Sequence, residues 1–318
     1  MLPHKAIRVA SFVAARTGLL TSLDRWNRHR GGIIVAFHDV SRQTLTTHLN
    51  HIAERYEFVS LTAMARRIAQ RRSTTGLAAI TFDDGLKDVI EAAAEIAHQR
   101  GWPMTFFLPT AALDRQQPFW FQEIDALLLT AIGRTLVLGD TRYHLHNKQA
   151  VKRVSDIVDL QFKNHKTEEE SIRLLDSIRV SLFGTPARPD GIRISEPISW
   201  SRVRELAQRS ELSFESHSIT HRATSRLDAP ALKQELVDSK SRIEEMTGRP
   251  VEHFCYPYGG ERDIGTEAPE LVRKLFRTGT TMARGRCSPA NDLALLPRVP
   301  LYEGDAEEVV AMKIGTAR

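Results

Sequence analysis

Two aspartates and two histidines have the residue types and spacing of a hydrolytic metal centre. Asp83 and Asp84 stand side by side before Gly85 at the end of an apolar run, and His217 and His221 lie four residues apart far downstream. Adjacent carboxylates at a turn point in different directions, so we expect one of them to ligate a metal while its neighbour stays free to take a proton. Two nitrogens and one oxygen leave coordination positions open for water and substrate, as in catalytic zinc sites.

The spacing of the histidines predicts that both imidazoles face the same way on one helical turn, directly after the apolar run 212–215. Neither pair is specific alone, because turns favour Asp and Gly and a His-x-x-x-His is common by chance. Together they favour one divalent ion, Zn2+ first, although Co2+, Ni2+ or Mn2+ suit the same ligands.

The carboxylates need a strand to carry them, and the run 77–82 predicts a buried parallel strand that ends in a turn at Gly85 and continues as a helix over 86–99. Further strands are expected at 32–37, 58–61, 104–108, 212–215, 253–256, 277–282 and 296–301. Further helices are expected at 45–54, 62–72, 200–209, 230–247 and 269–276. This α/β alternation predicts a closed barrel with its chemistry at the carboxyl ends of the strands. An open doubly wound sheet is the alternative, but the chain lacks a Gly-x-Gly-x-x-Gly signature.

The alternation breaks over residues 111–196, where charged segments at 149–160 and 166–179 predict a mainly helical insertion after the fourth strand, with 185–191 as its return linker. Phe119, Trp120 and Phe121 near its start are either a sugar-stacking platform or, as the favoured alternative, anchors of the insertion on the barrel.

Composition places these elements in one large domain over residues 32–318. The chain has 318 residues, 42% of them hydrophobic, and only two cysteines, Cys255 and Cys287, which give no disulfide framework. A net charge of +5 is spread among acidic residues rather than gathered in a stripe, so we expect no nucleic-acid partner.

Residues 1–31 predict a basic amphipathic helix, and no run of the chain reaches the roughly 18 apolar residues of a membrane span. Arg8 and Arg16 interrupt its apolar run, which argues against a cleaved signal peptide. The helix either lies on an anionic membrane face or packs outside the domain. We therefore expect a cytoplasmic protein, in the first case peripheral to the inner face of a membrane; no oligomeric state is predicted.

A third motif follows the expected strand 253–256. Pro257 stops that strand and Gly259 permits a tight turn, so the Tyr258 N–H can point inward as a donor to an oxyanion. An ordinary strand-terminating turn is the alternative.

In order, Thr-Phe-Asp-Asp-Gly (81–85), Ser-His-Ser-Ile-Thr-His (216–221) and Tyr-Pro-Tyr-Gly (256–259) resemble the motifs of the polysaccharide deacetylases, the fourth carbohydrate esterase family. The resemblance covers residues 32–302 without the insertion. It implies a distorted seven- or eight-stranded βα barrel and a metal-dependent hydrolase that removes N-acetyl or O-acetyl groups from sugars. Carried over by position, it implies Asp83 as general base, the Tyr258 N–H as oxyanion donor, and three metal ligands: Asp84, His217 and His221.

The chain departs from the family pattern in three places. Cys255 replaces the arginine that orients the base, no Asp-x-x-Trp motif is recognisable over 277–285, and Arg298 stands where the family has its acid histidine. We expect Arg298 to approach Asp83 and take over the orienting charge. His38, at the end of the first strand, is our candidate general acid, with a structural histidine as the alternative; its aromatic-His pair resembles the branch linked to exopolysaccharide modification.

These expectations combine into one predicted function. The chain would be a metal-dependent hydrolase that removes acetyl groups, N-acetyl first, from an amino-sugar polysaccharide or a lipid-linked glycan precursor, so that its partner is a carbohydrate substrate. The alternative is a catalytically silent glycan-binding barrel of the same fold, suggested by the missing arginine and the missing acid.

Overall fold

The computed structural model describes residues 27, 29–118, 120–165, 167–192 and 194–317. The helix expected over residues 1–31 therefore lies almost entirely outside the described residues, and its membrane contact and the cytoplasmic location stay predictions. In the described ranges, none of the helices combines the length and apolar character that a bilayer span requires.

Seven parallel strands close into a barrel. In order around the ring they are β1 (Ile33–Phe37), β10 (Leu296–Pro300), β9 (Thr278–Arg284), β8 (His253–Cys255), β7 (Leu212–Ser216), β4 (Met104–Leu108) and β3 (Leu77–Phe82), which pairs back with β1. The short β2 (Glu57–Phe58) extends the sheet beside β3. The α/β fold class and the distorted barrel are thus confirmed, and the open sheet is excluded because β1 and β3 pair over five registered positions.

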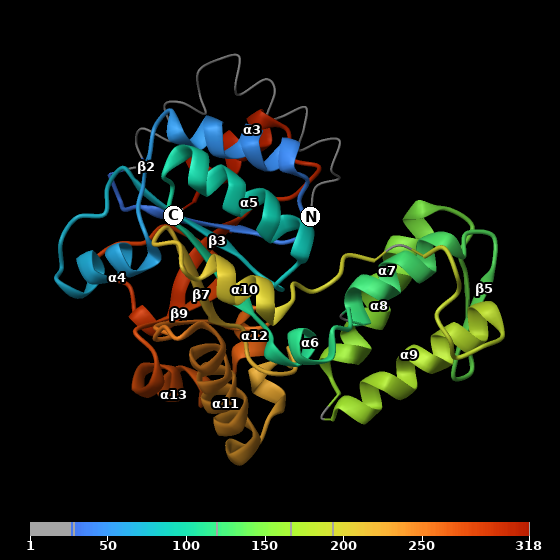
Figure 1. Cartoon of the computed structure of the whole chain (residues 1–318). Helices are drawn as coiled ribbons and strands as arrows, with labels where there is room; N and C mark the ends of the chain where they lie inside the picture. Colours follow the sequence, from blue (N-terminus) through green and yellow to red (C-terminus); the bar gives the residue numbers. More distant parts are fainter. Residues whose placement is uncertain (1–26, 28, 119, 166, 193, 318) are drawn as a thin grey trace.

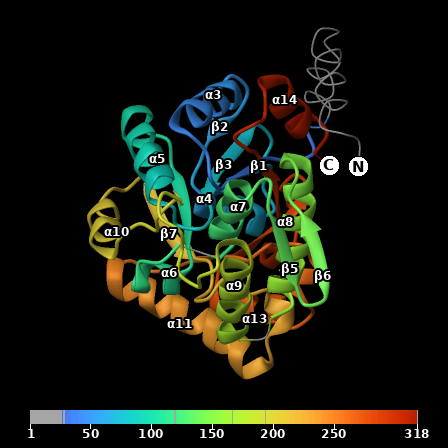
Figure 2. The same cartoon turned by 90° about the vertical axis from the view of Figure 1, so that its right-hand side faces the viewer.

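Helices surround this ring, as Figure 2 shows in a view with the insertion in front. The main ones are α3 (Arg42–Ala53), α4 (Leu61–Ala69), α5 (Lys87–Arg100), α10 (Trp200–Leu206), α11 (Ala229–Thr247), α13 (Ala268–Leu275) and α14 (Glu307–Gly315). Shorter turns are α6 (Thr110–Arg115), α12 (Glu261–Ile264), η1 (Thr224–Arg226) and η2 (Leu293–Leu295). Side chains of Ser41, Ser60, Ser199 and Asp228 cap four of the helices by accepting backbone N–H bonds.

A ladder of aromatic rings holds one side of the barrel. Phe37, Phe82, Phe106 and Phe214 stand in register on four neighbouring strands, with successive ring centroids 5.4, 5.0 and 5.4 Å apart. These rings belong to the core cluster that includes the surrounding helices. Because side chains alternate along a strand, Thr81 and Asp83 fall on the opposite side of β3 from Phe82, toward the barrel interior.

The insertion forms a separate lobe beside the barrel, at the right of Figure 1. It contains α7 (Trp120–Thr130), α8 (Lys148–Lys163) and α9 (Glu168–Phe183), together with a hairpin of β5 (Thr135–Leu138) and β6 (Thr141–His144) that the sequence did not predict. Its apolar residues form a core cluster of their own. The Trp120 ring stacks on Phe162 of α8 at 3.9 Å, so its stacking partner lies inside the insertion rather than on the barrel. Phe119 and the Phe121 side chain lie outside the description.

Candidate active site

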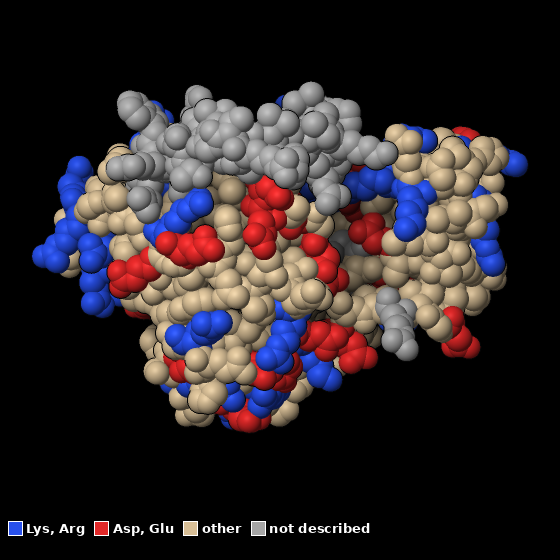
Figure 3. Space-filling model, turned by 90° about the horizontal axis from the view of Figure 1, so that it is seen from above, with Lys and Arg blue, Asp and Glu red and all other residues tan. Residues whose placement is uncertain are grey.

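A cavity of about 610 Å³ lies where the barrel faces the insertion. The barrel contributes His38, Asp39, Asp83, Asp84, His217, His221, Tyr256, Tyr258, Met282 and Tyr302, and the insertion contributes Trp120, Gln122, Asp125, Leu129, Asp159 and Lys163. Seen from above, the two lobes are separated by a recess with acidic side chains near it (Figure 3). The predicted site residues that line this cavity come from the carboxyl ends of β1, β3, β7 and β8, as the barrel rule requires.

Several site residues have left-handed backbone conformations, which L-residues rarely adopt. The φ angles are +71° at Asp84, +67° at Ser218, +57° at His221 and +60° at Tyr258. Each such residue costs about 1–2 kcal/mol relative to ordinary backbone. Strain of this kind persists only where surrounding contacts determine the conformation, and it is concentrated here in the loops that carry the predicted ligands and the predicted oxyanion donor.

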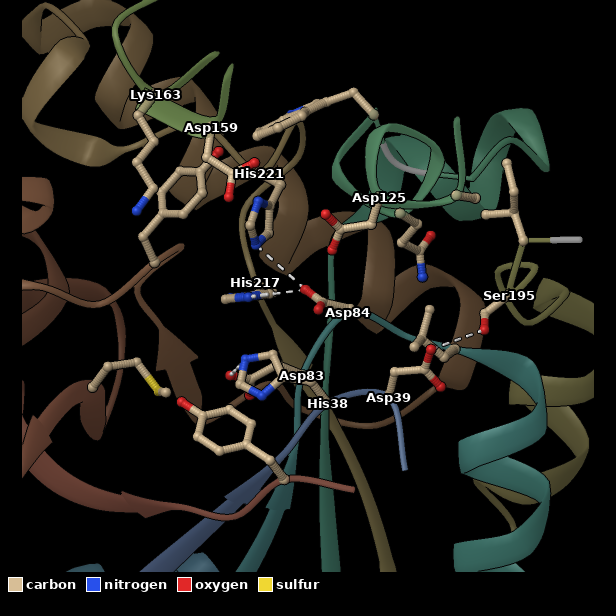
Figure 4. Close-up of a pocket in the computed structure, with 18 of the residues that line it drawn as sticks. His38, Asp39, Asp83, Asp84, Asp125, Asp159, Lys163, Ser195, His217 and His221 are labelled. Atoms are coloured by element: carbon tan, nitrogen blue, oxygen red, sulfur yellow. Dashed lines mark hydrogen bonds and ion pairs between the residues drawn. The ribbon is translucent and has the colours of Figure 1, made fainter. Parts of the chain in front are cut away.

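The structure brings Asp84, His217 and His221 together (Figure 4). Asp84 Oδ1 lies 3.7 Å from His217 Nε2 and 3.3 Å from His221 Nε2, and all three side chains are buried. Three ligands bound at 2.0–2.2 Å on a tetrahedral ion would lie about 3.4 Å apart. Among the described residues, none donates a hydrogen bond to the buried Asp84 Oδ1. The donor set and its spacing therefore fit one divalent metal ion.

The surroundings of His217 suit a metal ligand. Its Nδ1 lies 2.7 Å from the Cys255 carbonyl oxygen and must donate to it, which leaves Nε2 as the lone-pair nitrogen facing Asp84. Burial, and then the neighbouring His221, lower the pKa of His217 to about 4, so the imidazole is neutral at pH 7. Burial would raise the pKa of Asp84, but His221 beside it lowers that pKa overall.

The expected helical turn for the two histidines is wrong. Residues 217–223 form an irregular loop after β7, in which positive φ at Ser218 and His221 brings both rings to one side, with centroids 4.8 Å apart. A right-handed helical turn over these residues is excluded, because Ser218 and His221 have left-handed backbone conformations.

Asp83 has a different set of partners from its neighbour. Arg298 Nη1 and Nη2 donate to its two carboxylate oxygens, each at 2.7 Å, in a bidentate pair that is fully buried. The guanidinium also donates to the Thr281 carbonyl oxygen at 3.0 Å and to Thr81 Oγ1 at 3.2 Å. Arg298 thus lies against Asp83 as the sequence led us to expect, and its orienting role in catalysis stays a prediction.

The electrostatics of this pair follow from its burial. Burial would raise the pKa of Asp83, but the charge and hydrogen bonds of Arg298 outweigh it and hold that pKa below its ordinary value. Cys255, which stands where the family has arginine, lies with its Sγ 3.1 Å from Arg298 Nη2 and 3.6 Å from Asp83 Oδ2. Burial raises the pKa of the Cys255 thiol, so the sulfur is neutral. Cys255 on β8 has a short side chain, and the guanidinium of Arg298 from β10 occupies the space beside Asp83.

His38 also reaches this carboxylate. Its Nε2 lies 3.4 Å from Asp83 Oδ2, and 32% of its side chain is exposed in the cavity. An imidazole that faces both the carboxylate and the open cavity can accept or donate a proton there. The general-acid role and the structural alternative both stay open for His38, and Figure 4 shows its ring beside Asp83.

Tyr258 lies at the centre of a three-residue turn. Gly259 N–H donates to the Pro257 carbonyl oxygen at 2.7 Å, which closes the turn. Within the described chain, no residue accepts a hydrogen bond from the Tyr258 N–H. The Lys163 ammonium of α8 lies 4.5 Å from the centre of the Tyr258 ring, so the insertion contacts this turn directly.

Several cavity residues were not predicted. Asp39 accepts from Ser195 at 3.4 Å, Asp125 accepts from Ser155 at 2.6 Å, and Asp159 lies one helical turn before Lys163. Burial and the charge of Asp125 raise the pKa of Asp159 to about 6. No motif marks these residues. Asp125 and Asp159 lie on helices of the insertion and face the cavity only through its docking, whereas Asp39 follows His38 at the carboxyl end of β1.

Comparisons with known proteins agree with this geometry. The sequence profile of the family described as polysaccharide deacetylase matches residues 70–275. Among curated proteins, none matches this sequence. Three similar solved structures are the Streptococcus pyogenes deacetylase PplD in complex with acetate (TM-score 0.56, 14% identity), IcaB from Ammonifex degensii (0.53, 16%) and the BpsB deacetylase domain from Bordetella bronchiseptica (0.51, 16%). The alignments with PplD, IcaB and BpsB cover 89%, 90% and 85% of this chain, respectively. They cover 97%, 98% and 95% of those three chains in the same order.

Proposed function

Because the chain belongs to the polysaccharide deacetylase family, we propose that this cavity is the centre of a metal-dependent hydrolase that removes acetyl groups, N-acetyl first, from an amino-sugar polysaccharide or a lipid-linked glycan precursor. One observation carries the proposal. Two adjacent carboxylates open into one cavity with separate partners: Arg298 holds Asp83, and two imidazoles face Asp84. The acetate in the PplD structure is the acid that such a hydrolysis releases.

The ligands would be Asp84, His217 and His221, and Zn2+ is the ion that we expect, with Co2+, Ni2+ or Mn2+ as alternatives. When bound, such an ion supplies a Lewis acid and lowers the pKa of a water molecule. Asp83, held in one orientation by Arg298, takes the proton of the attacking water. The Tyr258 N–H donates to the oxyanion, a contribution of about 3 kcal/mol for one such donor.

Collapse of the intermediate needs a proton on the departing amine. His38 is our candidate donor, because it faces the cavity and lies within 3.4 Å of the carboxylate that receives the first proton. A proton taken by Asp83 could therefore reach the leaving nitrogen through one imidazole. The silent-barrel alternative was motivated by the missing arginine of the third motif and by the missing acid. The guanidinium of Arg298 beside Asp83 removes the first motive, and His38 is proposed in place of the missing acid.

The test is acetate release from acetylated glucosamine oligomers by the full chain with added Zn2+, Co2+ or Mn2+. We expect release by the wild type and a loss of at least a hundredfold in Asp83→Asn. Asp156→Asn, on the exposed face of α8, is the matched control and should keep full activity. A wild-type protein that binds the ion tightly yet releases acetate from neither amide nor ester substrates would favour the glycan-binding alternative.

A further inference from the structure

A buried glutamate lies behind the histidine loop and does not face the cavity. Glu235 is on α11 and lies on the buried face of this helix. The same face carries the apolar residues Leu232, Leu236 and Ile243. Only 3% of Glu235 is exposed. A carboxylate in a buried stripe requires specific partners, because desolvation of an unpaired charge is expensive.

Among the described residues, the hydrogen-bond partners of this carboxylate all belong to one short segment, 219–222. Glu235 Oε2 accepts the backbone N–H of Ile219 at 2.7 Å and of Thr220 at 2.9 Å. Glu235 Oε1 accepts the Thr220 hydroxyl and the Arg222 guanidinium, the latter at 3.0 Å. Two successive N–H groups pointing at one anion form a backbone nest, and the guanidinium balances the charge.

These contacts hold the residues on both sides of His221, which lies between Thr220 and Arg222 and has a φ of +57°. Its own N–H donates to Ser218 Oγ at 3.1 Å, and Ser218 is also left-handed. Without contacts that hold them, Ser218 and His221 would relax from left-handed backbone to the more favourable right-handed or extended conformations. The nest around Glu235 therefore opposes the relaxation that would turn the His221 imidazole away from Asp84.

The same helix holds the start of the loop. Ser239, one turn after Glu235 on α11, lies with its Oγ 2.7 Å from Ser216 Oγ at the end of β7. Helix α11 thus anchors the segment before His217 and the segment around His221. The segments that carry the two imidazoles therefore both contact one helix.

We propose that Glu235 is a positioning residue that keeps His221 in its ligating conformation, so that the metal affinity of the site depends on a carboxylate that does not contact the ion. The inference rests on the proposed metal site. Residues that orient ligands from behind typically change metal affinity by about ten- to a hundredfold when they are altered.

The experiment measures the dissociation constant for Zn2+ by competition with a chromophoric chelator, and the melting temperature of each metal-free protein. Glu235→Gln should bind Zn2+ about ten- to a hundredfold more weakly. Thr220→Val, which removes one hydroxyl contact to the same carboxylate, should weaken binding less. Asp238→Asn, on the exposed side of α11, is the control and should bind like the wild type.

The outcomes separate positioning from mere stabilisation. If Glu235→Gln lowers the melting temperature of the metal-free protein but leaves the dissociation constant unchanged, the positioning role is refuted and the proposed metal site stands. If Glu235→Gln does not fold, Thr220→Val decides, since an unchanged constant there also refutes the inference. Failure of the wild type to bind Zn2+, Co2+ or Mn2+ overturns the proposed metal site and this inference together.

Discussion

Replacement of Arg298 by leucine tests how the guanidinium acts on the buried Asp83 carboxylate, our proposed general base. Arg298→Leu removes both 2.7 Å hydrogen bonds to Asp83 and leaves a carboxylate that is 3% exposed without its counter-charge. Breaking a buried ion pair by removing one partner costs about 3–5 kcal/mol, because the other charge stays buried. Folded domains are stable by about 5–15 kcal/mol, so we expect the variant to fold at 25 °C with a lowered melting temperature.

The catalytic cost is separate from the cost in stability. Without the bidentate contact, the Asp83 carboxylate can rotate, and a misplacement of about 1 Å lowers a catalysed rate by about a hundredfold. We expect Arg298→Leu to lower kcat/KM for acetate release by at least that factor. Arg277→Leu is the control, because its pair with Glu252 is partly exposed and contributes less than about 1 kcal/mol.

A double-mutant cycle makes the reasoning refutable. Urea unfolding should show that the double variant Asp83→Asn with Arg298→Leu loses less free energy of unfolding than the two single variants lose together, because it leaves no unpaired buried charge. The difference, which is the coupling energy of the pair, should be about 1–3 kcal/mol. Additive effects would show that the pair does not stabilise the fold as a unit. Full deacetylase activity in Arg298→Leu would refute the orienting role.

Four further predictions concern the rest of the site. His38→Ala should lower turnover and remove one limb of its pH profile if His38 is the acid; an unchanged profile would assign it a structural role. Removing metal with a chelator should abolish acetate release and lower the melting temperature, both restored by Zn2+; activity that survives complete chelation would contradict the site. Gly259→Ala would place a Cβ 2.6 Å from the Met282 nitrogen, at a residue whose φ is +62°, so the turn at Tyr258 must shift. We expect kcat to fall about a hundredfold while the protein remains folded, because the Tyr258 N–H leaves its position; unchanged kinetics would argue against the oxyanion role. The pKa of Asp159 is raised to about 6, so this carboxyl binds a proton more tightly in the folded protein, and its contribution to stability falls as the pH rises from about 4 to 6. Asp159→Asn should therefore be about 1 kcal/mol more stable than the wild type at pH 7, after discounting for the partial exposure of Asp159, and equally stable near pH 4. Urea titrations at both pH values check this.

Local patterns in the sequence determined the strands and the residue types of the site. The buried run before Asp83, the turn at Gly85 and the apolar segment before His217 report backbone preferences and burial, which neighbouring residues encode. Because every parallel strand of a barrel ends at the same face, the strand assignments alone placed Asp83, Asp84, His217 and His221 near one another. The sequence analysis did not single out Glu235, whose burial on α11 is seen only in the structure.

The tertiary structure decided which groups touch. Arg298 reaches Asp83 across 215 residues only because β1 closes the ring between β10 and β3, and a short side chain at Cys255 leaves it room. The histidine pair is set by left-handed backbone that α11 supports, where spacing alone had predicted a helical turn. The wall of Asp125, Asp159 and Lys163 exists only because the insertion docks over the barrel. Sequence spacing constrains neighbours along the chain, whereas contacts between distant side chains depend on ring closure, strand register and docking, which no local pattern records.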